Sequence, residues 1–363
     1  MSSINSPKDN LIFIDPDTDC GISFDRFYQD INPEGRPESP SREYIAFCEI
    51  VAAIVNHADL NLANPQNTND PKIIKSETVT RENIVGKINN STSKIVLSTS
   101  GTTGIKKQVT HSIESLSRGL QVSHQHRNDV WGLAYPLNHL AGLQVMLQAV
   151  MNHNSIVQLF GLPNKLIHHS IESSQITHLS CTPTFLKLLS TMNLTHPGVQ
   201  RLTTGGERLG KLDQALAQQI FPKARHRNIY ALTEIGNLLI SENDIFSIPE
   251  ALKEKVSVIE GGLSIHFSLL ADTTHENHDE WYRTGDLVEV IQIEPLQFRI
   301  LTRRDDVINV GGNKIVPQVV EQRLLEIAGI EQALVYGKGN SLTGQIVACD
   351  IVASSNQKLN LDE

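Results

Sequence analysis

The sequence has few cysteines and no long apolar segment, and each shortage removes a class of protein. Its four cysteines, Cys20, Cys48, Cys181 and Cys349, lie far apart in the chain. They form no close pair of the kind that zinc sites use, which favours reduced thiols over a disulfide scaffold. No apolar run approaches the roughly 18 residues of a membrane-spanning helix, and the polar N-terminus lacks a signal-peptide core. We therefore predict a cytoplasmic protein without a membrane partner.

A strong excess of positive charge is also missing. The chain has 31 basic and 40 acidic residues, a net charge of −9, and no basic block. Nucleic-acid binding needs concentrated positive charge, so we predict no nucleic-acid partner. With 363 residues, of which 39% are hydrophobic and 20% charged, the chain can bury a large core and form more than one domain.

The stretch from Ser98 to Lys107 contains five hydroxyl residues, two glycines and two lysines. It lies between the apolar run 95–97 and a segment with helical spacing, which predicts a strand, a loop and a helix. Glycines let backbone N–H groups approach a phosphate, hydroxyls add donors, and lysine adds charge. The loop is thus predicted to bind polyphosphate, although taken alone a Ser/Thr-rich surface turn would be the favoured interpretation. The usual P-loop is excluded because only two residues separate Gly101 from Gly104.

Apolar runs alternate with helical patterns between residues 131 and 190, which predicts a mainly parallel sheet with helices. Ligands then belong at the carboxyl ends of its strands, and we place the phosphate loop at such an end. Between residues 256 and 300, short β-rich runs predict a small antiparallel or barrel-like unit. The predicted fold class is α/β. A large N-terminal domain, residues 1–304, combines parallel sheets, helices and the β-barrel-like unit, and a small truncated α+β domain follows over residues 305–363.

Four segments carry a family resemblance. The loop is followed by Asn228-Ile229-Tyr230-Ala231-Leu232-Thr233-Glu234, by Trp281-Tyr282-Arg283-Thr284-Gly285-Asp286, and by a stretch that begins Arg303-Arg304-Asp305-Asp306. In this order they resemble the adenylate-forming superfamily of acyl-CoA and aryl-CoA synthetases, peptide-synthetase adenylation domains and luciferases. The resemblance implies an AMP-forming carboxylate ligase that uses ATP and Mg²⁺ to activate a small carboxylic acid as an acyl-adenylate. The acyl group then passes to coenzyme A or to a carrier-protein thiol.

The resemblance also implies roles for individual residues. The catalytic candidates are Lys107, Thr233, Glu234 and His139. The nucleotide-binding candidates are Thr99, Ser100, Gly101, Thr102, Thr103, Gly104, Gly205, Gly206, Glu207, Tyr230, Ala231, Asp286 and Arg303. Of the catalytic candidates, Glu234 is also the expected Mg²⁺ ligand, because this hard cation prefers oxygen ligands. For His139 a structural histidine, and for Glu207 a helix cap, are equally weighted alternatives.

The sequence departs from the family pattern in two places. Lys106 and Gln108 replace the proline and glycine that normally flank the loop lysine, and no Pro-Lys-x-x-x-Gly-Lys motif follows residue 341. The resemblance is therefore to a short member that lacks the C-terminal catalytic-lysine motif. A catalytically degenerate protein that binds a nucleotide or acyl-AMP, as a partner or regulator, is the alternative function. Retention of four residues argues against it: Lys107, Glu234, Asp286 and Arg303.

Two histidine pairs suggest metal ligands only weakly. No carboxylate or cysteine cluster accompanies His124 and His126 or His168 and His169 in the sequence. Solvated histidines explain such pairs better than a transition-metal site does.

Overall fold

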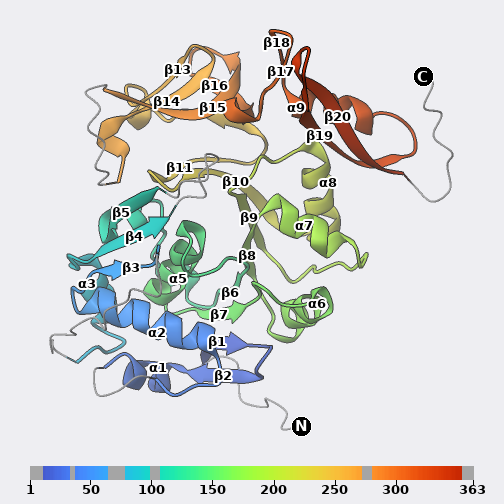
Figure 1. The fold of residues 1–363 in the computed structure, drawn as a ribbon. Coiled ribbons are helices and arrows are strands. Elements are labelled where there is room, and N and C mark those ends of the chain that lie inside the picture. Colours follow the sequence, from blue (N-terminus) through green and yellow to red (C-terminus); the bar gives the residue numbers. More distant parts are fainter. Residues whose placement is uncertain (1–10, 33–36, 64–77, 99–106, 272–279, 354–363) are drawn as a thin grey trace. The chain divides into compact units, whose positions relative to one another are not determined.

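The computed structural model describes residues 11–32, 37–63, 78–98, 107–271 and 280–353. The chain divides into two compact units (Figure 1). The first consists of Met1–Asp244 with Leu270–Asn277, and the second of Ile245–Leu269 with His278–Glu363. The domain boundary predicted at residues 304/305 lies inside the second unit and stays a prediction.

An eight-stranded sheet is the framework of the first unit. Its order is β11-β10-β9-β8-β6-β7-β1-β2. All neighbours from β10 to β1 are parallel, whereas the edge strands β11 and β2 are antiparallel. The strands are β1 (Leu11–Asp15), β2 (Cys20–Ser23), β6 (Val130–Leu133), β7 (Ser155–Gln158), β8 (His178–Cys181), β9 (Arg201–Gly205), β10 (Arg225–Leu232) and β11 (Gly236–Ser241). The prediction of a mainly parallel sheet in an α/β fold is confirmed.

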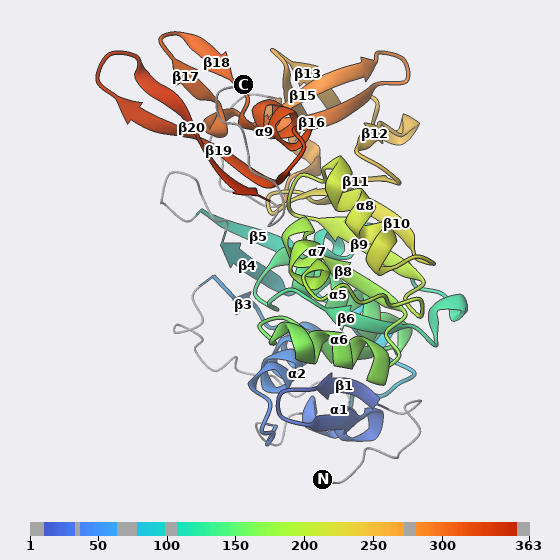
Figure 2. The ribbon, with the colours of Figure 1, turned by 90° about the vertical axis from the view of Figure 1, so that its right-hand side faces the viewer.

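Helices cover both faces of this sheet. The described helices of the unit are α1 (Phe24–Asp30), α2 (Arg42–Val55), α3 (Ile84–Asn89), α4 (Ile113–Leu116), α5 (Leu140–Asn152), α6 (Asn164–Ser173), α7 (Pro183–Ser190) and α8 (Lys211–Ile220). Successive side chains of a strand point to opposite faces. Ile156 of β7 thus joins the apolar core with α2 and α5, and its neighbour Val157 joins the core with α6, α7 and α8. Figure 2 shows α6, α7 and α8 in front of the sheet.

Hydroxyl side chains begin two of these helices. Ser41 Oγ accepts a hydrogen bond from the Tyr44 N–H at 3.1 Å, and Thr182 Oγ1 accepts one from the Phe185 N–H at 3.1 Å. Each bond satisfies a backbone donor that has no partner inside the helix. The starts of α2 and α7 are thus fixed by residues that are local in the sequence.

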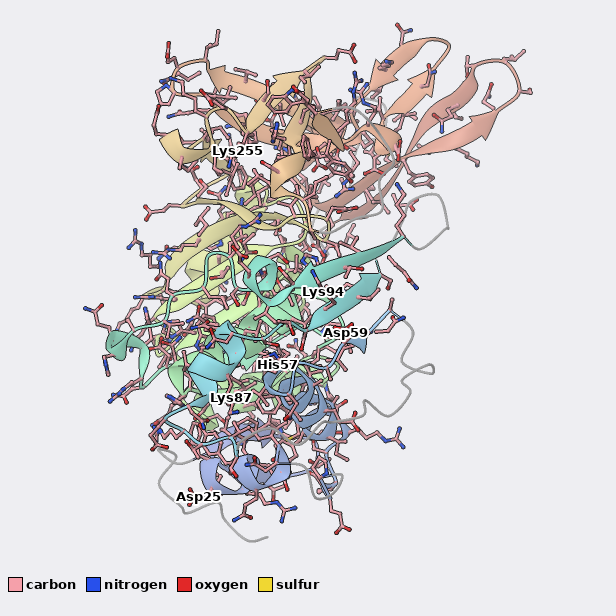
Figure 3. All side chains as sticks on the ribbon, turned by 90° about the vertical axis from the view of Figure 1, so that its left-hand side faces the viewer. Asp25, His57, Asp59, Lys87, Lys94 and Lys255 are labelled. Atoms are coloured by element: carbon pink, nitrogen blue, oxygen red, sulfur yellow. The ribbon has the colours of Figure 1, made fainter. Side chains whose placement is uncertain are left out.

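The segments on either side of the predicted phosphate loop form a separate small sheet. Its order is β3-β4-β5, with β3 (Leu60–Asn61), β4 (Lys94–Ser98) and β5 (Gln108–Ser112). In this sheet the Lys94 backbone N–H donates to Asp59 Oδ1 at 2.7 Å, and both residues are labelled in Figure 3.

Two predictions about the phosphate loop are wrong. β4 does not belong to the large parallel sheet, so the loop is not at one of its carboxyl ends. The loop is also not followed directly by a helix, because β5 returns antiparallel to β4, with Ser98 opposite Gln108. β5 forms because buried Val109 and His111 alternate with more exposed neighbours, which is the two-residue period of a strand. Residues 99–106, with the candidates from Thr99 to Gly104, lie outside the described residues.

The second unit contains two antiparallel sheets and a helix. One sheet has the order β12-β16-β15-β14-β13 and the other β18-β17-β20-β19. The strands are β12 (Ile245–Ser247), β13 (Val256–Ile259), β14 (Gly262–His266), β15 (Trp281–Gln292), β16 (Gln297–Arg303), β17 (Ile308–Val310), β18 (Asn313–Ile315), β19 (Ile330–Asn340) and β20 (Gly344–Ala353). The helix α9 (Pro317–Leu325) begins at a proline, which is favoured in the first turn of a helix. The prediction of a small antiparallel unit is confirmed.

The helices formed by the described residues include none with both the length and the apolar character that crossing a lipid bilayer requires.

Gly142 of α5 provides a test of this packing. A Cβ atom at residue 142 would lie 2.2 Å from the carbonyl oxygen of Pro136. Because that neighbour is backbone, we expect Gly142→Ala to displace the segment before His139 and lower the free energy of unfolding by about 1–3 kcal/mol. Gly86 of α3 is the matched control, since a Cβ there meets nothing within 4 Å. Gly86→Ala should leave stability unchanged or raise it by up to about 1 kcal/mol. Equal urea-unfolding curves for the two variants would contradict this packing.

Candidate active site

The carboxyl ends of four neighbouring parallel strands bring predicted site residues to one edge of the large sheet. β6, β8, β9 and β10 are consecutive in the sheet and run in the same direction. His139 follows β6, Gly206 and Glu207 follow β9, and Thr233 and Glu234 follow β10. Ligands of open parallel sheets bind outside the carboxyl ends of the strands. We therefore take this edge as the candidate active site.

Glu207 connects two of these segments. Its Oε2 atom accepts hydrogen bonds from the Thr184 N–H at 2.9 Å and from Thr184 Oγ1 at 2.7 Å. Thr184 lies in the first turn of α7, so the carboxylate caps that helix and also meets the positive end of its dipole. The cap alternative is thus what the structure shows for Glu207. A further role of Gly205, Gly206 and Glu207 beside adenine stays a prediction.

The backbone that carries the catalytic candidates after β10 is held at three consecutive carbonyl groups, those of residues 233–235. His111 Nε2 donates to the first at 2.6 Å. The backbone N–H of Ala271 donates to the second at 2.8 Å, and Arg118 Nη1 donates to the third at 3.2 Å. We call residues 233–235 the braced segment. Because its carbonyl groups are fixed, the side chains at positions 233 and 234 leave the backbone in a defined direction.

His111 is a functional residue that the sequence prediction missed. It is fully buried, and its Nδ1 atom lies 2.9 Å from Ser115 Oγ. A carbonyl oxygen can only accept, so Nε2 carries the proton in the bond to Thr233. Burial lowers the pKa of His111, which keeps the ring neutral at neutral pH. The sequence offered one clue to this role. His111 alternates with more polar positions as a buried strand residue does, and it lies four residues after the motif lysine.

Tyr230 and Ala231 lie at the end of β10, where the pairing with β11 is irregular. Tyr230 is opposite Leu239, whereas Ala231 is opposite Asn237, so the register shifts between them. A bulge of this kind changes the direction of a side chain and is frequent beside active sites. The Tyr230 ring is buried. Stacking on adenine stays a prediction for it.

Lys107 and His139 are both exposed. Lys107 directly precedes β5 and is four residues from His111, so strand geometry places its Cα within about 13 Å of that histidine. His139 precedes the first residue of α5, and partial burial lowers its pKa. Lys107 thus directly precedes the strand whose His111 contacts the braced segment.

In the second unit, Asp286 and Arg303 lie together, as expected for residues with a common ligand. They are opposite each other on β15 and β16, and Arg303 Nε is 2.9 Å from Asp286 Oδ1. Asp286 is only 4% exposed, and its backbone N–H donates to Thr284 Oγ1 at 3.0 Å. Arg303 therefore neutralises and orients a buried carboxylate, whose role toward ribose stays a prediction.

Glu234 fits the predicted magnesium ligand. Its carboxylate is half-buried and lies beside the carbonyl that Ala271 fixes. Proteins usually hold Mg²⁺ with one or two carboxylates together with substrate phosphates. The chemistry of Glu234 fits such a site, and its role toward Mg²⁺ stays a prediction.

Comparison with known proteins agrees with this arrangement. The chain belongs to the AMP-binding enzyme family, whose model matches residues 45–258. A 2-succinylbenzoate–CoA ligase of Staphylococcus epidermidis is 27% identical over 298 residues, which cover 74% of this chain and 61% of that protein. The Listeria monocytogenes ligase of the same name is 28% identical over 295 residues, covering 71% and 59%. The chain thus matches about three fifths of the length of these relatives.

Solved structures share the fold. The o-succinylbenzoate CoA synthetase of Bacillus subtilis, in complex with its acyl-adenylate intermediate, has a TM-score of 0.63 at 16% identity, covering 96% of this chain and 87% of that one. ATP-bound MatB of Rhodopseudomonas palustris has a TM-score of 0.66 at 16% identity, covering 99% and 88%. These likenesses confirm that the fold is that of adenylate-forming enzymes.

The His111 contact predicts a specific pH dependence of stability. Burial places the pKa of folded His111 below the unfolded value of 6.5. The stability it contributes is present above pH 6.5 and is lost as the pH falls, because the unfolded chain binds the extra proton. Between pH 6.5 and 5, His111→Gln should reduce the slope of unfolding free energy against pH by up to about 1.4 kcal/mol per unit.

Urea unfolding over this pH range measures the slope. His124 is exposed, so His124→Gln is the control and should retain the slope of the unmodified chain. An unchanged slope in His111→Gln would contradict the assigned buried, neutral histidine.

Proposed function

We propose that this chain is an AMP-forming ligase that activates a small aryl carboxylic acid with ATP and transfers the acyl group to coenzyme A. The observation that carries the proposal is the braced segment 233–235 at the carboxyl edge of the sheet, inside the part of the chain that matches the AMP-binding family. The names of the relatives support an acid of the 2-succinylbenzoate type, and coenzyme A rather than a carrier protein as the acceptor.

The proposed reaction has two steps. A carboxylate oxygen of the acid attacks the α-phosphorus of ATP, and the bond to the β-phosphate bridging oxygen breaks, so that pyrophosphate leaves. The thiol of coenzyme A then attacks the acyl carbon and loses its proton, and AMP leaves. Neither step needs a protein nucleophile. The chain has to position the reactants and stabilise the charge that develops on the phosphates.

The proposed roles are those that the resemblance to the adenylate-forming superfamily implies, and the charges of the side chains suit them. The Thr233 hydroxyl donates to the α-phosphate, and the Lys107 ammonium group neutralises the outer phosphates. Glu234 holds Mg²⁺, which would further neutralise the phosphate charge. His111 acts as a positioning residue, because it holds the backbone carbonyl of Thr233, whose side chain is proposed to contact the α-phosphate. Asp286, oriented by Arg303, accepts hydrogen bonds from the ribose hydroxyls.

We propose the cytoplasm as the location of this activity. All four cysteines are free in the structure. Free cysteines without a disulfide are typical of proteins of a reducing compartment.

Acid-dependent pyrophosphate release tests the proposed function. We expect release with ATP, Mg²⁺ and an aryl acid such as 2-succinylbenzoate, and slower release with long-chain fatty acids. If the chain binds ATP but releases no pyrophosphate with any acid of a broad panel, the proposal fails and the alternative of a nucleotide-binding regulator is favoured.

The role of Lys107 can be separated from that of the fold. Lys107→Ala should lower the rate of adenylation by roughly 10²- to 10³-fold, the usual effect of losing one donor to a developing charge. Thioester formation from supplied acyl-AMP should change much less, since the outer phosphates are absent from that step. Lys223 is exposed and precedes β10, at the opposite end of that strand, so Lys223→Ala is the control. Equal losses in both half-reactions would contradict the assigned role.

Removal of a ribose hydroxyl tests Asp286. For the unmodified chain, 3′-deoxy-ATP or 2′-deoxy-ATP should bind at least about tenfold more weakly than ATP, because a buried carboxylate loses a donor. For Asp286→Asn, the affinities for ATP and the deoxy analogue should be nearly equal. Calorimetric titration gives both affinities. If Asp286→Asn prefers ATP over the deoxy analogue by as large a factor as the unmodified chain does, the proposed contact between Asp286 and the ribose is refuted.

A further inference from the structure

Three metal-ligating side chains converge at the amino-terminal edge of the large sheet, away from the candidate active site. His126 ends the 3-10 turn η3 (His124–His126), Asp129 precedes β6, and His178 begins β8. One ligand atom from each lies within 4.8 Å of the other two. The sequence prediction treated His126 as solvated because it found no carboxylate cluster. That prediction is wrong, since both histidines are buried and Asp129 lies between them.

The distances suit a small transition-metal ion. Asp129 Oδ2 is 2.9 Å from His126 Nδ1 and 3.3 Å from His178 Nε2. A tetrahedral ion with bonds of about 2.0–2.1 Å holds its ligand atoms roughly 3.3 Å apart. The two distances to Asp129 are close to this value, and the two histidine nitrogens lie within 4.8 Å of each other. Two imidazoles and one carboxylate are a common donor set for Zn²⁺ and for non-haem iron.

The surroundings hold the His178 ring in the orientation that a ligand requires. His178 Nδ1 is 2.9 Å from Thr177 Oγ1, which also accepts the Val130 N–H at 2.8 Å. The Trp131 ring packs against the imidazole, with ring centroids 4.9 Å apart. Metal-bound histidines usually have such a hydrogen bond at the second ring nitrogen. Burial lowers the pKa of His178 to about 4, so the ring is neutral at neutral pH.

Ordinary hydrogen bonding explains only part of the cluster. Asp129 accepts a hydrogen bond from His126 Nδ1, and a structural carboxylate would need nothing more. However, the Nε2 atom of His178 is buried and, among the described residues, has no hydrogen-bond partner of acceptable geometry although it faces Asp129. His178 as a whole is 3% exposed. A buried nitrogen aimed at a carboxylate without a bond is the arrangement that a shared cation would complete.

We propose that His126, Asp129 and His178 bind one divalent transition-metal cation of the Zn²⁺ class. The ion would join the turn before β6 to the start of β8. Because this is the edge opposite the carboxyl ends of the same strands, the site is structural and separate from the proposed phosphate chemistry. Arg201 is opposite His178 on β9, and its positive charge adds to burial in lowering the pKa of that histidine, whereas Asp129 raises it.

Metal titration of the full chain tests the proposal. The protein is stripped with a chelator and titrated with Zn²⁺ alone and with Co²⁺ alone, followed by competition with a chromophoric chelator and by cobalt d–d absorption. We expect one equivalent per chain in a nitrogen and oxygen environment. Zn²⁺ at about 100 times its dissociation constant should raise Tm by about 5 °C or more.

Matched variants locate the ion. Asp129→Asn and His178→Gln should each weaken Zn²⁺ binding by at least about tenfold. His124, an exposed neighbour of the cluster, gives the control His124→Gln, which should bind as the unmodified chain does. Asp129→Asn keeps an acceptor for His126, and circular dichroism of the metal-free variant checks that it folds. Stoichiometric binding that both cluster variants retain, or the absence of any Zn²⁺-dependent rise in Tm, would overturn the proposal.

Discussion

The hydrogen bond between His111 and the carbonyl oxygen of Thr233 is the constraint on which the candidate active site depends. The two residues are 122 positions apart in the chain. The bond ties the small sheet, which carries the loop lysine, to the segment after β10. A buried imidazole costs free energy unless its nitrogens are bonded, so His111 stabilises the fold only when the catalytic segment is in place. The site geometry therefore forms together with the fold. Ala271 and Arg118 hold the two following carbonyl groups, those of residues 234 and 235, in the same way.

The parallel sheet separates two kinds of chemistry. Ile156 and Val157 of β7 join apolar cores on opposite faces of the sheet, and the polar side chains of the two proposed sites lie where strands begin or end. At the carboxyl ends of β6, β8, β9 and β10 the loops carry the residues proposed to act on ATP. At the amino ends of β6 and β8, the turn with Asp129 meets His178. The carboxyl edge is suited to a ligand that binds and dissociates. The amino edge has buried histidines and is suited to the proposed structural ion.

The second unit organises its polar residues through antiparallel register. Asp286 and Arg303 face each other because β15 and β16 pair at these two positions. The left-handed Gly285, with φ of +81°, and a register shift after Leu287 occur on either side of the aspartate. Residues with side chains rarely adopt a positive φ. The Thr-Gly-Asp motif is thus a strand with a local irregularity that buries a carboxylate against an arginine, and the surrounding sheet holds the pair in place.

The sequence by itself determined the family, the mainly parallel sheet, and helix starts such as Ser41 and Thr182, because periodicity, caps and motifs are local properties of the chain. It also gave the order of the site segments. Only the tertiary structure decided that β5 pairs with β4, that His111 holds Thr233, and that His178 reaches Asp129. Each of these depends on strand order and register, which bring together residues distant in sequence. A lone histidine has the same local pattern whether its partner is water, a carbonyl group or a carboxylate, so burial and neighbours had to assign its role.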